Sequence, residues 1–108
     1  MAPATIELLY FTECPNAERT RVLIEDVAAE VGVSIDLKLL EVKTPDHVER
    51  LRFLGSPTLR VKGRDVEPGA DERETFMYAC RVYRTEGGLS GQPARDWVRT
   101  ALVVPTGG

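Results

Sequence analysis

Cys14 is one of two cysteines in this chain of 108 residues, and it stands immediately before Pro15. Proline is favoured at the first position of a helix, because its missing N–H would have no partner there. Cys14 then becomes the N-cap, with its sulfur near free main-chain N–H groups and the positive end of the helix dipole. Both favour the nucleophilic thiolate, whereas the carboxylate of Glu13 opposes it. We therefore expect an at least partly exposed, reactive thiol; the alternative is a small apolar side chain that fills space at a strand end.

The elements that position Cys14 follow from hydrophobic patterning. Residues 5–11 form a short apolar run typical of a buried strand. A helix should follow, because apolar residues then recur with helical spacing before Gly32, at Leu23, Ile24, Val27, Ala28 and Val31. Residues 34–42 predict a second strand. Thr44-Pro45 predicts the start of a short helix that carries Val48, Leu51 and Leu54 and stops at Gly55.

The second half of the chain is less regular. Residues 57–61 predict a third strand, and a turn leads to a brief fourth strand around Val66. Residues 67–92 form an insertion in which 71–84 fits a helix or an extended stretch, and 86–91 reads as a loop. Gln92-Pro93 opens a last helix, and residues 104–108 are expected to fray.

These elements predict one α/β domain over residues 1–108, in the order β-α-β-α-β-β-(insertion)-α. Alternating strands and helices imply that the first two strands pair in parallel through a right-handed crossover. The hairpin of the third and fourth strands adds antiparallel pairing. We expect a mixed four-stranded sheet with helices on both faces.

Two junctions carry a resemblance to a known family. Cys14-Pro15 stands where the first strand becomes the first helix, and Gly55-Ser56-Pro57-Thr58-Leu59 stands where the second helix becomes the third strand. In this the chain resembles the thioredoxin superfamily, whose members carry Cys-Pro-x-x or Cys-x-x-Cys at the first junction and a cis-proline, commonly followed by Thr, at the second. The resemblance implies a thioredoxin-like fold and a cis Ser56–Pro57 bond.

The same resemblance implies roles for the residues at these junctions. Cys14 would be the catalytic nucleophile, and the substrate would contact Pro15, Ser56, Pro57 and Thr58. A cis bond would leave the Ser56 N–H and C=O free to pair with an extended protein segment. Arg19 is a further candidate contact to the thiolate or to an anion.

The chain departs from the dithiol members of that superfamily, because Ala17 occupies the position of their second cysteine. It then resembles the monothiol glutaredoxins, whose single cysteine exchanges with glutathione or another low-molecular-weight thiol as co-substrate. Their cluster-binding Gly-Phe-Ser is missing, so iron–sulfur binding is not implied, and we expect neither a metal nor an organic cofactor. Cys80 is either a resolving thiol for a mixed disulfide on Cys14 or a packing residue beside Phe76 and Tyr83.

The charge and composition of the chain limit the classes of partner that it is expected to bind. The net charge is −3, and no Lys/Arg cluster exceeds two residues, so neither a nucleic acid nor a membrane is indicated. No signal peptide or membrane-spanning run is recognised, and two cysteines are too few for a disulfide framework, which predicts a cytoplasmic protein. His47 is expected on the surface without a metal or acid–base role. The acidic run 67–74 reads as a solvated loop or, alternatively, as a contact for a basic partner.

The sequence therefore predicts a monothiol-type thiol–disulfide oxidoreductase. Two alternatives stay open: a non-catalytic thioredoxin-fold binding module, and capture of a soft metal or organomercurial by Cys14 with Cys80. The substrate, the reductant and the oligomeric state are not determined by these patterns.

Overall fold

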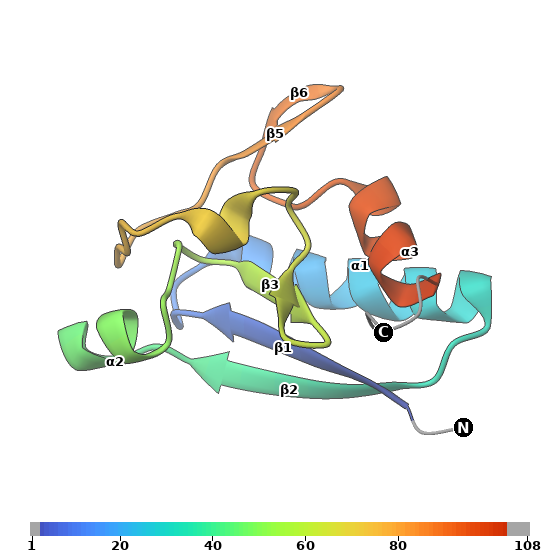
Figure 1. Ribbon diagram of the computed structural model, residues 1–108, viewed down its shortest axis with the longest axis horizontal. Helices are drawn as coiled ribbons and strands as arrows, with labels where there is room; N and C mark the ends of the chain where they lie inside the picture. Colours follow the sequence, from blue (N-terminus) through green and yellow to red (C-terminus); the bar gives the residue numbers. More distant parts are fainter. Residues whose placement is uncertain (1–2, 104–108) are drawn as a thin grey trace.

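The computed structural model describes residues 3–103 and shows an α/β arrangement with a mixed four-stranded sheet and three α-helices in that part of the chain (Figure 1). None of these helices has the length and apolar character needed to cross a bilayer. Residues 104–108, expected to fray, lie outside the described residues. The elements in chain order are β1 (Ala4–Tyr10), α1 (Pro15–Val31), β2 (Ile35–Glu41), α2 (Pro45–Arg50), β3 (Thr58–Val61), β4 (Arg64–Asp65), the 3-10 turn η1 (Ala70–Glu72), β5 (Tyr83–Thr85), β6 (Gly88–Ser90) and α3 (Arg95–Val103).

The sheet has the strand order β2-β1-β3-β4. β1 and β2 are parallel, as the strand–helix–strand pattern predicts, and β3 runs antiparallel to β1 and β4. In the β1–β3 register Leu9 lies opposite Thr58. The end of β1 therefore meets the start of β3, so the residues that follow β1 and those that precede β3 lie at the same edge.

One face of the sheet is covered by α1 and α3, which lie side by side (Figure 1). α1 begins at Pro15 and ends where Gly32 adopts a left-handed conformation with φ of 71°, as its position after the apolar stripe predicts. Arg95 and Arg99 of α3 form ion pairs with Glu30 of α1. The core between helices and sheet consists of Ile6, Ile24, Val27, Ala28, Leu59, Val61, Val66, Val98 and Leu102.

The opposite face is covered at one end only, by α2. Thr44 caps this helix and Pro45 opens it, as predicted. The helix ends at Arg50 rather than continuing toward Gly55, because Arg52 takes a left-handed φ of 53° that turns Phe53 into the core. Phe53 packs there with Leu9, Val42 and Val48. The expectation of helices on both faces therefore holds at this end alone.

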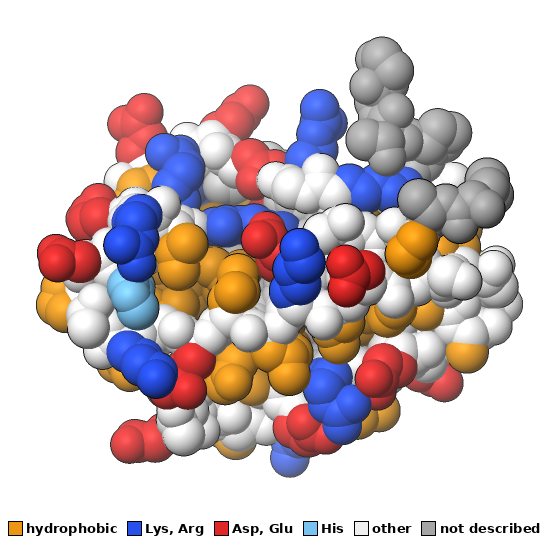
Figure 2. All heavy atoms as spheres, turned by 90° about the horizontal axis from the view of Figure 1, so that it is seen from below, with side chains coloured by type: hydrophobic (Ala, Val, Ile, Leu, Met, Phe, Trp, Pro, Cys, Tyr) orange, Lys and Arg blue, Asp and Glu red, His pale blue; other side chains and the backbone are white. Residues whose placement is uncertain are grey.

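The rest of that face carries polar side chains. Glu7 and Arg60 lie opposite each other on β1 and β3, and Lys38 lies beside Glu7 on β2. Figure 2 views the molecule from the side of β2 and α2, where hydrophobic patches alternate with Lys, Arg, Asp and Glu side chains. A six-residue helix is about 9 Å long at 1.5 Å per residue, which is too short to cover strands of seven residues.

Residues 67–92 contain no α-helix, which decides the helix-or-extended alternative for 71–84 in favour of the extended form. After η1 the chain runs extended until the small hairpin of β5 and β6, whose two strands pair with each other outside the main sheet. Part of the expected loop 86–91 is therefore strand β6. In Figure 1 this insertion, coloured yellow to orange, passes along one end of the main sheet before α3 begins.

Candidate functional site

Cys14 is the N-cap of α1, the position expected from Pro15. Its main-chain N–H donates to the Phe11 carbonyl at 3.0 Å, which closes the turn between β1 and α1. The thiol makes no capping hydrogen bond. Cys14 is only 8% exposed, so the expectation of a partly exposed thiol is wrong.

The Ser56–Pro57 bond is cis, as expected, and lies directly before β3. The Ser56 hydroxyl accepts a hydrogen bond from the Phe11 N–H at 3.3 Å. Phe11 thus joins the two junctions, since its N–H contacts Ser56 and its carbonyl contacts Cys14. Thr58 is fully buried and donates to the Gly55 carbonyl at 2.6 Å, which gives it a structural role in the turn.

The main-chain groups of Ser56 are already occupied. The Ser56 N–H donates to the Ala79 carbonyl at 2.8 Å, and the Ser56 carbonyl accepts from the Arg81 N–H at 2.9 Å. These two bonds form a parallel bridge between Ser56 and Cys80. The expectation that these groups are free for a substrate is therefore wrong, because the extended insertion pairs with them.

Cys80 lies on this paired strand as an exposed, free thiol. It does not pack in a cluster with Phe76 and Tyr83: Tyr83 is fully buried, while Phe76 packs against the core under α2. The Tyr78 ring, two residues before Cys80, contacts the Phe11 ring, with centroids 5.0 Å apart. The segment that carries Cys80 thus pairs with Ser56 and contacts Phe11 in the turn before Cys14.

A second segment of the insertion contacts the start of α1. Gly91, in the connection between β6 and α3, approaches Asn16 so closely that a Cβ at Gly91 would collide with the Asn16 side chain. Asn16 is the second residue of α1 and is separated from Cys14 only by Pro15. The start of α1 is therefore bordered by two parts of the insertion.

The strand of Cys80 is held in place by Arg81, a residue that the sequence did not single out. The Arg81 side chain is 2% exposed, and its guanidinium makes two hydrogen bonds to Asp65, at 2.7 and 2.9 Å. It also donates to Glu67 at 2.9 Å and to the Thr58 hydroxyl at 3.2 Å. Arg81 Nε has no hydrogen-bond partner in the part of the chain that the structure describes. Burial by itself lowers the pKa of Arg81, but the hydrogen bonds and charges of Asp65, Tyr83 and Glu67 together outweigh it and hold the pKa above the usual value of arginine.

Tyr83 completes this anchor. The Arg81 guanidinium lies over the Tyr83 ring, 4.3 Å from its centroid, and the Tyr83 hydroxyl donates to the Pro57 carbonyl. Burial raises the pKa of the Tyr83 hydroxyl above its usual range, so the group stays a hydrogen-bond donor. The turn before β3 is thus attached to the insertion by main-chain and side-chain bonds.

The acidic run 67–74 is only partly the solvated loop that was expected. Glu67 is buried and binds both Arg81 and Arg73, whereas Asp71, Glu72 and Glu74 are exposed. Arg81 alternates with Ala79 and Tyr83 along an extended stretch. This alternation is the one local signal in the sequence that Arg81 is buried. Its carboxylate partners lie 14 and 16 residues away and have no recognisable spacing.

The remaining predicted residues are not joined to the thiol. Arg19 is exposed on α1 and forms no hydrogen bond or ion pair with any described residue. Pro15 is exposed at the first position of α1. His47 is half-buried at the start of α2, where its Nδ1 accepts from the Lys43 N–H. Residues 3–103 contain no group of three or more His, Cys, Asp or Glu side chains arranged to hold a metal ion.

We expect Gly55→Ala to loosen the strand of residues 79–81. Gly55 has φ of 110°, and a Cβ there would lie 3.0 Å from the Arg81 Cβ and 3.1 Å from the Ala79 carbonyl. Gly88 is the matched control, because its φ is 112° and nothing lies within 4 Å of its added Cβ. Chemical denaturation should show a loss of about 1–2 kcal/mol for Gly88→Ala from backbone strain and about 1–3 kcal/mol more for Gly55→Ala from the close contacts. Equal losses would contradict the close packing of this strand on Gly55.

Accessibility predicts the order of thiol alkylation. Iodoacetamide should modify the exposed Cys80 before the buried Cys14 in the folded protein, as followed by peptide mass spectrometry. Arg81→Met removes the guanidinium that anchors the strand and leaves Asp65 unpaired, at a cost of about 3–5 kcal/mol. Cys14 should then react faster under conditions in which circular dichroism shows the variant folded. The exposed Arg84→Met is the control, and an unchanged Cys14 rate in Arg81→Met would show that the strand does not protect it.

Comparisons with known proteins identify no relative of this chain. No protein-family model matches it, and neither the curated proteins nor the solved structures contain a match. The chemistry of Cys14, Ser56 and Cys80 has therefore to be inferred from their own geometry.

Proposed function

We propose that this chain is a thiol–disulfide exchange protein of the thioredoxin superfamily, with Cys14 as its nucleophile. One observation carries the proposal: the turn that ends at Cys14 is bonded through Phe11 to Ser56, and Ser56 binds an extended strand through both main-chain groups. Because residues 79–81 already fill the Ser56 edge, a thiol beside this edge suits a small disulfide substrate better than an extended peptide. The mixed sheet, with parallel β1 and β2 and antiparallel β3, supports the same family.

The attacking group in this scheme is the Cys14 sulfur, as thiolate, at the N-cap of α1. It attacks one sulfur of a substrate disulfide, forms a mixed disulfide with it, and releases the other substrate sulfur as a thiolate that takes up a proton. A second thiolate then attacks the Cys14 sulfur and releases the remaining substrate half as a thiol. The substrate disulfide is reduced, and the two attacking thiols are oxidised to a new disulfide.

Cys80 is the second thiol that the geometry favours. It lies in register with Ser56, two residues after the Tyr78 ring that contacts Phe11, and is exposed. In this proposal Cys80 supplies the second thiol that the chain lacks at Ala17. Two molecules of glutathione or of another low-molecular-weight thiol would then return the Cys14–Cys80 disulfide to two thiols and become oxidised to their own disulfide. No metal or organic cofactor enters this scheme.

The burial of Cys14 favours a second function from another class. A thiol that is 8% exposed, beside an edge that the chain itself fills, also suits a non-catalytic module. Such a module would bind an extended partner segment at Ser56 after residues 79–81 withdraw. It would not depend on either sulfur.

Single-cysteine variants separate these functions. In an assay that couples glutathione-dependent reduction of bis(2-hydroxyethyl) disulfide to glutathione reductase, Cys14→Ser should abolish the activity, because the nucleophile is lost. Cys80→Ser should keep a glutathione-dependent rate, because glutathione can resolve the mixed disulfide in its place. Cys14→Ser activity equal to that of the unaltered chain would refute the catalytic proposal.

Mild oxidation tests whether Cys80 is the resolving thiol. Mass spectrometry should find an intramolecular Cys14–Cys80 disulfide, seen as the loss of two hydrogens and absent from both serine variants. Bridging requires the Cα atoms of the two cysteines to come within about 4.4–6.8 Å of each other. If the unaltered chain forms only Cys14 adducts with small thiols, Cys80 is not the resolving thiol and the protein acts as a monothiol.

A further inference from the structure

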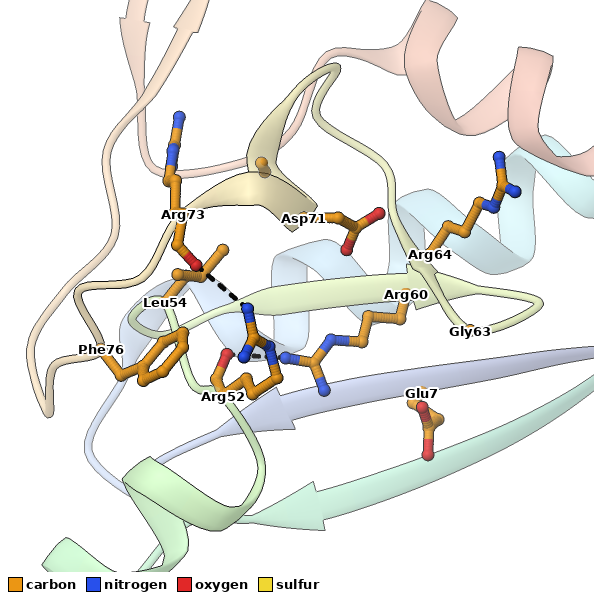
Figure 3. A pocket seen from close by; sticks show the side chains of 10 residues that line it. Glu7, Arg52, Leu54, Arg60, Gly63, Arg64, Asp71, Arg73 and Phe76 are labelled. Carbon is orange, nitrogen blue, oxygen red and sulfur yellow. Dashed lines mark hydrogen bonds between the residues drawn. The ribbon is translucent and has the colours of Figure 1, made fainter.

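A cavity of about 380 Å³ lies on the face of the sheet that α2 leaves uncovered (Figure 3). Its walls come from β1, from the link between α2 and β3, from β3 and β4, and from the segment around η1. Ligand sites in proteins generally enclose about 300–1,000 Å³, so the cavity has room for a small metabolite. It shares no lining residue with the Cys14 site, and its function is independent of the one proposed above.

The cavity is rich in arginine although the chain as a whole carries a net charge of −3. The four arginines of its lining are Arg52, Arg60, Arg64 and Arg73, and the two carboxylates are Glu7 and Asp71.

The cationic charge of this lining is only partly neutralised by the protein. Arg73 is paired with Glu67 at 3.0 Å, and Asp71 accepts the Asp65 N–H at 3.1 and 3.2 Å. Arg60 lies opposite Glu7 in the sheet, yet no ion pair joins them. The other arginines of the lining, Arg52 and Arg64, also form no ion pair with a carboxylate of the described residues.

Main-chain carbonyls hold the two central guanidinium groups in place. Arg60 donates to the Arg52 carbonyl at 2.7 Å, and Arg52 donates to the Arg73 carbonyl at 3.3 Å. These bonds orient both side chains toward each other, as Figure 3 shows, but leave their charge uncompensated. The Arg52 guanidinium also lies over the Phe76 ring, 4.8 Å from its centroid. The cavity thus combines two oriented cations with one aromatic wall.

The backbone of Arg52 is a second observation, independent of the charges, that sets this residue apart. Arg52 follows the end of α2 with φ of 53°, its N–H bonded to the Glu49 carbonyl and the Phe53 N–H bonded to the Val48 carbonyl. This is the helix ending in which glycine is most common, because a Cβ is disfavoured in the left-handed region. An arginine there carries a backbone cost that glycine would avoid, and its local hydrogen bonds use main-chain atoms that glycine also has.

We propose that this cavity binds a small organic anion, whose phosphate or carboxylate group contacts Arg52 and Arg60 and whose ring packs against Phe76. The planar guanidinium presents paired N–H donors that match the oxygens of either group. Each of the two guanidinium groups donates one hydrogen bond to a main-chain carbonyl and has further N–H donors for a ligand.

The test measures binding of three probes to the full chain by NMR titration at low ionic strength: inorganic phosphate, phenyl phosphate and benzoate. Phenyl phosphate or benzoate should bind saturably and more tightly than inorganic phosphate, because only they reach Phe76. A preference for phenyl phosphate identifies a phosphate ligand, and a preference for benzoate identifies a carboxylate. Absence of saturable binding by both ring-bearing probes would overturn the proposal.

Three variants locate the site. Arg52→Gly should weaken the better probe about tenfold or more while leaving thermal stability nearly unchanged, because relief of the left-handed strain offsets the lost side-chain contacts with Arg73 and Phe76 and the carbonyl that holds Arg60 is kept. Arg60→Gln should weaken binding comparably. Arg50→Gln is the control, since Arg50 is exposed on α2 outside the cavity. If Arg50→Gln weakens binding as much as Arg52→Gly, the attraction is general surface charge and the proposal is wrong.

Discussion

The buried ion pair between Arg81 and Asp65 is the constraint on which the arrangement around Cys14 depends. A guanidinium that is 2% exposed must find partners for its charge and its donors, and Asp65, Glu67 and Thr58 provide them. Asp65 lies at the edge of the main sheet, in β4, so the pair fixes the insertion to that sheet. Two main-chain bonds to Ser56 then follow at little further entropic cost, because the strand is already held at Arg81. The position of Cys80 is a consequence of this anchor.

The unequal covering of the two sheet faces explains why the two candidate sites lie in separate regions of the molecule. α1 and α3 close one face over a continuous apolar core, and the start of α1 brings Cys14 to the edge near Ser56. α2 is short and covers one end of the other face, beyond which polar strand residues and arginines remain accessible. Cys14 thus lies near the main-chain pairing just before β3. The arginine cavity lies on the face of the sheet that α2 leaves uncovered. Phe76 packs at the border between the α2 core and that cavity.

Much of the first half of the fold is predictable because its signals are local. The apolar run before Cys14, the helical stripe that includes Ile24 and Val27, and Gly32 at the end of α1 each act within a few residues. The same holds for Thr44-Pro45 at the start of α2. The early end of α2 was missed, because Leu51 and Leu54 continue the apolar spacing while the burial of Phe53 in the tertiary core decides the turn.

By itself the sequence determined that a thiol begins the first helix and that a mixed α/β sheet positions it. Only the tertiary structure decided that Cys14 is buried, that Ser56 is paired and that Cys80 lies beside it. The physical reason is that residues 67–92 have no hydrophobic periodicity, so no local pattern specifies their path. Their conformation is set by contacts between distant residues, Arg81 with Asp65 and Tyr83 with Pro57, whose partners have no fixed spacing along the chain. In a sequence, a charged residue predicts an exposed position. It can hold two segments together in the interior only where folding places opposite charges beside it.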